Sequence, residues 1–160
     1  MEGILVALTF VTALGCGLSA GALFAFSSFV MRALARLTAP QGIAAMQSIN
    51  VQAVSPAFMT VLFGTGMACI AVGVWAVVDW HDSYGPWLLA GSAVYLAGPV
   101  GVTIAYNVPR NDALARIEPV AADAAAHWRR YVAEWTRGNH VRVVMGLAAA
   151  AALTGALRVG

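Results

Sequence analysis

Apolar residues occur along the chain in long blocks that predict four membrane-spanning helices. Residues 3–31 carry no charged side chain, and about 20 apolar residues suffice to cross the hydrocarbon core of a bilayer. The blocks 57–78 and 87–106 are also long enough to span it. The last block, 143–157, is shorter, so the final span must include residues from the polar stretch before it. We therefore expect an all-α, four-helix antiparallel bundle that forms a single membrane domain over residues 1–160.

Three connectors of different character join the expected spans. Residues 37–55 predict a short interfacial helix that leads into span two. Its expected apolar positions are Ile43, Ala44, Met46 and Ile49. The connector 79–86 is acidic and ends in a Gly-Pro turn signal. Pro109 should keep span three from simply continuing. Residues 112–137 mix charges of both signs with strong helix formers, which predicts an amphipathic helix that joins span four directly or breaks at Gly138.

Composition and charge support an integral membrane protein. The chain is 61% hydrophobic and 10% charged, whereas soluble domains carry about 25% charged residues. The net charge of +2 is small and spread out, so nothing suggests a nucleic-acid partner. The N-terminal apolar block lacks a basic start and is too long for a signal peptide, so we interpret it as a retained span. Cys16 and Cys69 lie in apolar runs and are expected to be small buried residues rather than a disulfide or a metal pair.

Arginine placement predicts the orientation of the bundle. The first and third connector regions contain arginines, whereas the second contains none and carries Asp79 and Asp82. The positive-inside rule then places connectors one and three in the cytoplasm and both termini outside. Arg158, near the C-terminus, is an exception to the rule in this orientation, because it would lie outside.

Five side chains between residues 128 and 142 carry the candidate chemistry. Trp128, Tyr131, Trp135, Asn139 and Arg142 step by 3, 4, 4 and 3 residues. At about 100° per residue, these steps keep them on one helical face. Polar side chains in a membrane helix are costly unless they face protein or a cavity, so this face is a candidate site. The alternative is interfacial anchoring, in which the aromatic rings form a belt and the arginine reaches toward the lipid head groups.

The expected topology brings further polar residues to the cytoplasmic end of this face. The residues that meet there are Asn50, Asn107, Arg110, Asn111, Trp135, Asn139, His140 and Arg142. Amide N–H groups can bind a carbonyl or enolate oxygen, and an arginine can stabilise a developing anion. We expect the Arg142 guanidinium to point into the bundle and to bond side-chain amides. The expected partners are Asn50, Asn107 and Asn111.

The sequence offers little support for a metal or haem site. His81 lies in the outer connector, and His127 with Glu134 would supply only two ligands. A haem would need an axial ligand, for which His140 is the one candidate, and it points about 120° away from Trp128 on the helical wheel. No acidic residue or histidine lies deep in a span, which disfavours a proton pump or an ion channel.

Four motifs resemble the small four-span membrane family named for fungal anthrone oxygenases. They are AGALFAF at 20–26, MQSIN ending at Asn50, NVPRN at 107–111 and Trp-x6-Trp-x3-Asn-x2-Arg from 128 to 142. Arg110 stands where the family often has a small or apolar residue. The resemblance extends over nearly the whole chain and implies oxidation of an anthrone to an anthraquinone by molecular oxygen, without a metal, flavin or other cofactor. Because much of the family is bacterial, it also implies a bacterial inner-membrane protein.

Our functional hypothesis is an oxygen-dependent, cofactor-free oxidase or monooxygenase of a hydrophobic polycyclic phenol. The catalytic candidates are Asn50, Asn107, Asn139, Arg142 and His140. The substrate-binding candidates are Asn111, Trp135, Tyr131, Trp128 and Phe26. His140, Glu134 and Tyr131 are alternatives for the base. The runner-up is a non-enzymatic membrane subunit or a binder of a quinone, a lipid or haem. The expected partners are the hydrophobic small molecule, oxygen, membrane lipid and a second copy of the chain in a homodimer.

Overall fold

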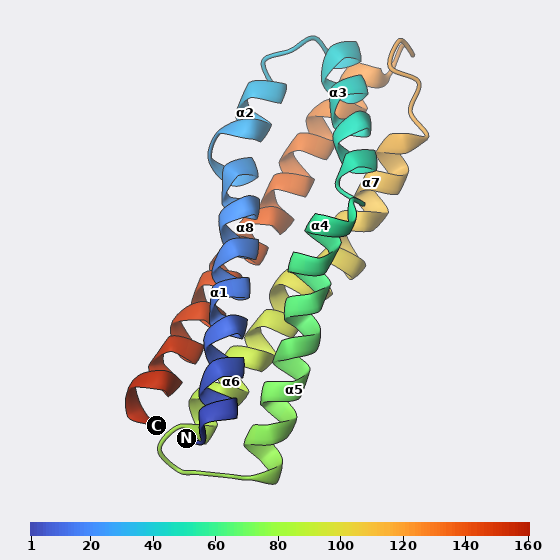
Figure 1. The fold of residues 1–160 in the computed structure, drawn as a ribbon. Helices are drawn as coiled ribbons and strands as arrows, with labels where there is room; N and C mark the ends of the chain where they lie inside the picture. The colour runs from blue at the N-terminus through green and yellow to red at the C-terminus, as the bar shows by residue number, and fades with distance from the viewer.

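The computed structural model describes residues 1–160, and all of its regular elements are helical (Figure 1). Four rods are long and apolar enough to cross a membrane, which confirms the expected fold. The symbol η denotes a π-helical stretch, which is wider than an α-helix. Rod one comprises α1 (Gly3–Ala25), η1 (Phe26–Val30) and α2 (Met31–Leu34), and the separate helix α3 (Ala39–Gln52) follows it. Rod two comprises α4 (Pro56–Met59), η2 (Thr60–Gly64) and α5 (Thr65–Val78). Rod three comprises α6 (Gly85–Tyr95), η3 (Leu96–Asn107) and α7 (Val108–Ala115), and rod four is α8 (Ala124–Val159).

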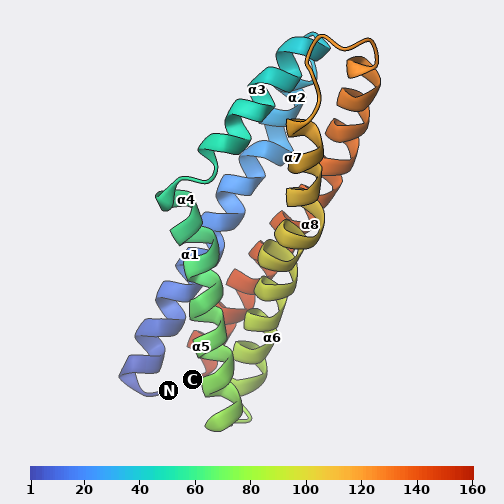
Figure 2. The ribbon, with the colours of Figure 1, turned by 90° about the vertical axis from the view of Figure 1, so that its right-hand side faces the viewer.

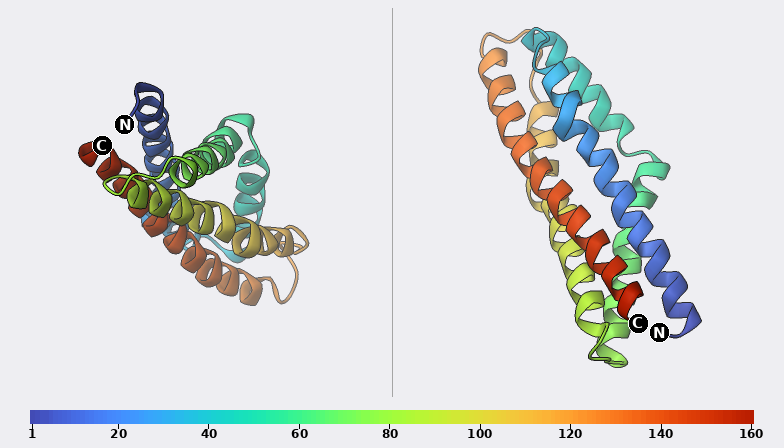
Figure 3. Two further views of the ribbon diagram at one scale, coloured as in Figure 1. Left: turned by 90° about the horizontal axis from the view of Figure 1, so that it is seen from below. Right: turned by 90° about the vertical axis from the view of Figure 1, so that its left-hand side faces the viewer.

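Consecutive rods run in opposite directions, so both termini lie at the same end of the bundle (Figures 1 and 3). There the amino group of Met1 donates to the carbonyl oxygen of Gly160 over 2.8 Å. α8 is the central packing element, because α1, α6 and η3 all lie against it (Figure 3). We call this end the terminal end and the opposite one, which carries α3, the α3 end.

Two apolar cores stabilise the bundle, one toward each end. The core near the terminal end includes Val72, Leu88 and Leu153. Cys16 and Cys69 lie in it, fully buried as the sequence predicts, with their Sγ atoms 4.0 Å apart. The core near the α3 end consists of Met31, Leu34, Ile43, Met46, Leu114, Ala124, Trp128, Tyr131 and Trp135. Five buried polar residues of the spans are Ser27, Thr103, Asn107, Asn139 and Arg142.

α3 covers the α3 end of the bundle and confirms the short helix expected between spans one and two (Figure 2). Ile43 and Met46 are fully buried in the core at that end. The Gln47 side chain donates from Nε2 to the carbonyl oxygens of Leu114 and Ile117, at 3.0 Å each. Leu114 lies in the last turn of α7 and Ile117 just beyond it, where carbonyl oxygens have free capacity for further hydrogen bonds. α3 is therefore tied to rod three by polar bonds as well as by apolar packing.

Three local expectations need correction. Pro109 does not end the third span, which stays helical to Ala115, because the proline lies where the π-helical turns of η3 give way to the α-helical turns of α7 within one continuous rod. The helix before span four does not extend over all of 112–137, because residues 116–123 are non-helical and α8 begins at Ala124; it joins span four directly, as one of the two alternatives predicted, without a break at Gly138. Ala44 is exposed rather than on the apolar side of α3, because it lies about 100° around the helix from Ile43.

We predict that cysteines introduced at Ser83 and Ala121 will be labelled from opposite sides of the membrane. Ser83 lies in the connector at the terminal end, and Ala121 lies in the connector at the α3 end (Figure 1). The native Cys16 and Cys69 are fully buried and should react slowly. Ala121→Cys should be protected from an impermeant thiol reagent added outside the cell, because arginine placement predicts a cytoplasmic position for its connector. Labelling of both positions from the same side would refute this topology.

Candidate functional site

α8 turns the predicted stripe of five residues into the bundle. Trp128, Tyr131, Trp135, Asn139 and Arg142 are all buried, none with more than 6% of its surface exposed. The three aromatic rings follow one another in stacked arrangements, with centroid separations of 5.8 and 6.4 Å. The helical spacing thus predicted the shared face correctly. Interfacial anchoring does not fit these side chains, because residues of an aromatic belt lie against lipid head groups.

A cavity of about 120 Å³ lies beside this stripe, between the two apolar cores. It is lined by Leu23, Phe26, Met46, Ile49, Asn50, Ala53, Val54, Phe58, Met59, Leu62, Thr103, Asn107, Val108, Asn111, Trp135 and Arg142. All three π-helical stretches contribute to it: Phe26 from η1, Leu62 from η2, and Thr103 with Asn107 from η3. Such wide turns are frequent at functional sites because they displace side chains from regular α-helical positions.

Arg142 is the one charged residue that lines the cavity. Its NH1 donates to Thr103 Oγ1 over 3.0 Å, and its NH2 donates to Asn139 Oδ1 over 2.7 Å. The guanidinium carbon lies 5.1 Å from the centre of the Trp135 ring, within the range of a cation–π contact. None of the ion pairs in the structure involves Arg142, although the side chain is buried. A buried charge without an opposite charge nearby is costly, so this cavity favours an anionic ligand.

The partners of Arg142 differ from those predicted. The guanidinium does point into the bundle, but it bonds Thr103 and Asn139 rather than the three expected amides. Side chains on a helix lean toward its N-terminus, which brings Arg142 over Asn139, three residues earlier on the same face. Asn139 in turn donates to the Leu23 carbonyl at 2.7 Å and to Ser27 Oγ at 2.8 Å, which ties α8 to rod one.

The three expected amides line the cavity next to Arg142. Asn107 donates from Nδ2 to the Trp135 carbonyl over 3.1 Å, and Asn111 Oδ1 accepts from the Tyr131 hydroxyl over 2.9 Å. Four buried polar atoms of lining residues have no hydrogen-bond partner: Asn50 Nδ2, Asn107 Oδ1, Trp135 Nε1 and Arg142 Nε. Three of them are donors. Because unpaired buried polar groups are costly, the cavity is suited to a ligand that carries acceptor oxygens.

Four of the ten candidate residues do not line the cavity. Tyr131 and Asn139 each bond a lining residue and so support the wall from behind. Trp128 packs against α3, where Gly42 leaves room for its indole ring. His140 is exposed on the outside of the bundle and connects to the cavity only through Ser27, which bonds both His140 Nδ1 and Asn139 at 2.8 Å.

Sequence reasoning missed two polar residues of this network, Thr103 and Ser27. Thr103 precedes Asn107 and Asn111 by four and eight residues, so helical spacing places all three on one face of rod three. That spacing was a usable signal. Ser27 offers no comparable signal, because serine is common in apolar helices and bonds its own backbone there.

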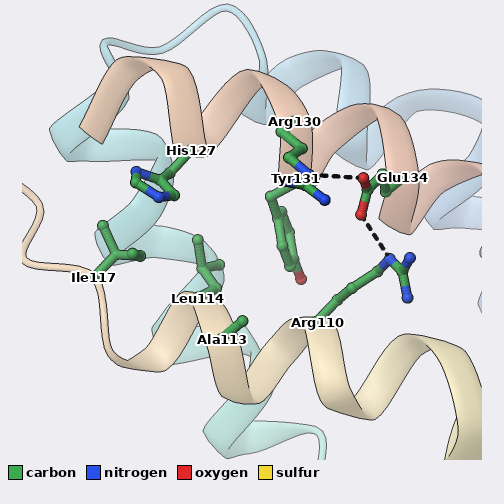
Figure 4. Close-up of a pocket in the computed structure, with 8 residues that line it drawn as sticks. All are labelled: Arg110, Ala113, Leu114, Ile117, His127, Arg130, Tyr131 and Glu134. Atoms are coloured by element: carbon green, nitrogen blue, oxygen red, sulfur yellow. Dashed lines mark hydrogen bonds and ion pairs between the residues drawn. The ribbon is translucent and has the colours of Figure 1, made fainter. Parts of the chain in front are cut away.

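A separate pocket of about 270 Å³ lies between α7 and α8 on the outside of the bundle (Figure 4). We call it the polar pocket; it is lined by Arg110, Ala113, Leu114, Ile117, His127, Arg130, Tyr131 and Glu134. Glu134 bridges two arginines there, at 3.0 Å from Arg110 Nε and 2.8 Å from Arg130 Nε. Glu134, one of the candidate bases, therefore belongs to this ion-pair cluster and does not line the cavity beside Arg142.

Gly138→Ala should destabilise the protein by about 1–3 kcal/mol. A Cβ at this position would lie 2.7 Å from Asn107 Oδ1 and would also overlap the Tyr106 ring, so η3 would have to move away from α8. Gly17→Ala is the control, because a Cβ there would meet no neighbouring element within 4 Å and alanine favours the helix. Thermal unfolding in detergent should show a lower midpoint for the first variant only. Equal midpoints would contradict the close contact.

A comparison with known protein families places the chain in one family. A family model described as anthrone oxygenase matches residues 56–152, which include most of rods two to four. The match contains Thr103, Asn107, Asn111, Trp135 and Arg142. No curated protein and no solved structure matches the chain. Because the family match extends over more than half of the sequence, the chain belongs to the anthrone oxygenase family.

Proposed function

We propose that the protein oxidises a hydrophobic polycyclic phenol of the anthrone type with molecular oxygen, and that Arg142 holds the substrate as an anion. The observation that carries this proposal is the buried guanidinium, which lines the cavity without a carboxylate partner. Arg142 Nε and Asn50 Nδ2 are donors without protein partners, and both can bond the oxygen of such an anion. The family to which the chain belongs supports the same chemistry.

The reaction is balanced without a further redox partner. Loss of a proton from the methylene carbon of an anthrone gives an anion whose charge lies largely on oxygen. This anion gives one electron to oxygen, and the resulting radical and superoxide combine to a hydroperoxide anion, which takes up a proton. Cleavage of the O–O bond and the remaining C–H bond then releases water and forms the second carbonyl. One anthrone and one oxygen molecule give one anthraquinone and one water molecule.

The cavity residues have distinct proposed roles in this reaction. Arg142 stabilises the anion by charge and by planar hydrogen bonding. Phe26 and Trp135, whose ring centroids lie 5.6 Å apart, supply aromatic surface for a flat ring system. The apolar residues around them keep water from the reacting carbon, which prevents side reactions of the radical pair. His140 acts on this site only indirectly, through Ser27 and Asn139.

A second candidate is a quinone binder that performs no oxidation. It is favoured by one observation, namely that no carboxylate or imidazole is among the residues that line the cavity. A substrate must then lose its proton to solvent before or during binding, and Arg142 favours the anion without accepting that proton. A quinone carries two acceptor oxygens and would use the same donors without any proton transfer.

Oxygen consumption by the purified protein distinguishes the two candidates. With anthrone in detergent, an oxygen electrode should record uptake above the uncatalysed rate, and anthraquinone should form in equal amount. The Arg129→Lys variant, altered at an exposed position of α8, should behave like the parent protein. Tight binding of anthraquinone without any catalysed uptake would reject the oxidase and support the binder.

A further inference from the structure

A second space adjoins the cavity on the outside of the bundle, between rod one and the α3–α4 segment. This lateral groove has a volume of about 350 Å³. Its lining residues are Ala22, Phe26, Ser48, Ile49, Gln52, Ala53, Ser55 and Phe58. Four of them, Phe26, Ile49, Ala53 and Phe58, also line the cavity. These four side chains, which we call the shared wall, separate the two spaces.

The surroundings of the lateral groove are those of a lipid-facing surface. Large apolar side chains are exposed beside it, with Phe24 at 56%, Val51 at 71% and Val54 at 70% exposure. Exposed apolar side chains on a membrane-spanning rod face the bilayer rather than water, and of these three residues Phe24 lies on such a rod. On its rod-one side the groove therefore borders the hydrocarbon region of the membrane.

The shared wall is only partly buried. Phe26 and Ile49 pack against the core near the α3 end, but no side chain of the wall is as buried as the residues of the two apolar cores. α3 packs mainly against α7 and α8, so its side toward α1 has little helical support (Figure 2). The helix is interrupted between Gln52 and Pro56, and Phe58 follows in the first turn of rod two. Phe26 and Phe58 are the two large side chains of the wall, and both line the cavity and the groove.

The polar pocket is a poor alternative route for an apolar molecule. Opening it would separate Glu134 from Arg110 and Arg130 (Figure 4). It would also break the hydrogen bond from Tyr131, which lines this pocket, to Asn111, which lines the cavity. Each of these interactions is charged or partly buried, and an apolar ligand could not replace the hydrogen bonds that would be broken.

We infer that the ligand of the cavity is a flat, membrane-dissolved polycycle that enters from the bilayer through the lateral groove and the shared wall. Its ionisable oxygen lies at Arg142, and its far ring extends past Phe26 and Phe58 into the groove. The volumes support this placement, because ligand sites usually occupy about 300–1,000 Å³. The cavity alone, at about 120 Å³, is smaller than that, whereas the cavity and the groove together are large enough. This inference rests on the proposed function and extends it to the substrate's shape and route.

Ala53→Phe tests the route, with Ala113→Phe as the matched control. Ala53 belongs to the shared wall, and Ala113 lines the polar pocket, so the same enlargement obstructs one route in each variant. The protein is reconstituted in phosphatidylcholine vesicles that contain anthraquinone, and binding is followed in a rapid-mixing experiment by quenching of tryptophan fluorescence. We expect Ala53→Phe to slow association at least about tenfold and Ala113→Phe to leave it unchanged.

Phe58→Ala is a second test of the same route and can be used even if Ala53→Phe does not fold. Removing the Phe58 ring widens the shared wall, so association should become faster while oxygen uptake, measured separately, still depends on Arg142. Slower association in Ala113→Phe with normal association in Ala53→Phe would overturn the inferred route, as would an unchanged rate in Phe58→Ala. Anthraquinone binding by the parent without oxygen uptake would reject only the proposed oxidation. Absence of anthraquinone binding by the parent would overturn both.

Discussion

Replacement of Arg142 by lysine should weaken the binding of an anionic hydroxyanthraquinone about 100-fold and lower the stability of the unliganded protein. The guanidinium bonds Thr103 and Asn139 at the same time and still offers Nε to the cavity. A lysine ammonium is a point charge and cannot reproduce this planar set of donors. Loss of such charged bonds in a buried site costs on the order of 3 kcal/mol, and about 1.4 kcal/mol corresponds to a tenfold change in affinity.

The control for this prediction is Arg129→Lys, which makes the same change at an exposed position of α8. Surface substitutions of this kind change stability by less than about 0.5 kcal/mol. Thermal unfolding and fluorescence titration with the hydroxyanthraquinone should therefore separate the two variants clearly. If Arg142→Lys retained the affinity and unfolding midpoint of Arg129→Lys, Arg142 would behave like an arginine that only reaches the lipid head groups. The proposed site would then be wrong.

Asn50→Asp should lower the affinity for the anionic hydroxyanthraquinone at least about tenfold more than the affinity for neutral anthraquinone, which loses only the Asn50 Nδ2 donor. Asn50 lines the same cavity as Arg142, and its Nδ2 has no partner. A carboxylate there would compensate the guanidinium charge and repel a second anion, and like charges brought together cost several kcal/mol. Without ligand, the variant should be as stable as the parent, because Arg142 gains an opposite charge.

The matched control is Ala44→Asp, which adds the same charge on the exposed side of α3. Titration of both variants with the charged and the neutral ligand gives four affinities, and the largest loss should be that of Asn50→Asp for the charged ligand. Equal losses for both ligands in Asn50→Asp would point to a steric effect and would contradict a role for charge in binding.

The fold could be predicted from the sequence because four apolar blocks and helical periodicity leave few arrangements. The inward face of α8 followed from the spacing of its five residues alone, and their burial confirms it. The effect of Pro109 was predicted wrongly, because a break depends on where proline lies within the turns of its own helix. η3 makes π-helical turns up to Asn107, so Pro109 follows directly after the change from π-helical to α-helical turns. No local sequence pattern predicts this change.

The membership of the candidate site was easier to predict than its hydrogen bonds. Asn50, Asn107, Asn111 and Arg142 all line one cavity, because the ends of antiparallel spans bring them to the same level. The partners of Arg142 depend on the rotamer of a long side chain and on the register between α8 and η3, which a single sequence does not define. The position of His140 outside the bundle follows from the helical wheel, which already placed it away from the aromatic stripe.

The ionisation state of a bound hydroxyanthraquinone tests the central claim most directly, because its visible band moves to longer wavelength when its phenol loses a proton. The dye is titrated with protein in detergent at a pH at which the free dye is neutral. If Arg142 holds the ligand as an anion, the bound dye should show the spectrum of the phenolate, and Arg142→Lys should greatly reduce this change. A dye that binds with the spectrum of the neutral phenol would contradict the claim.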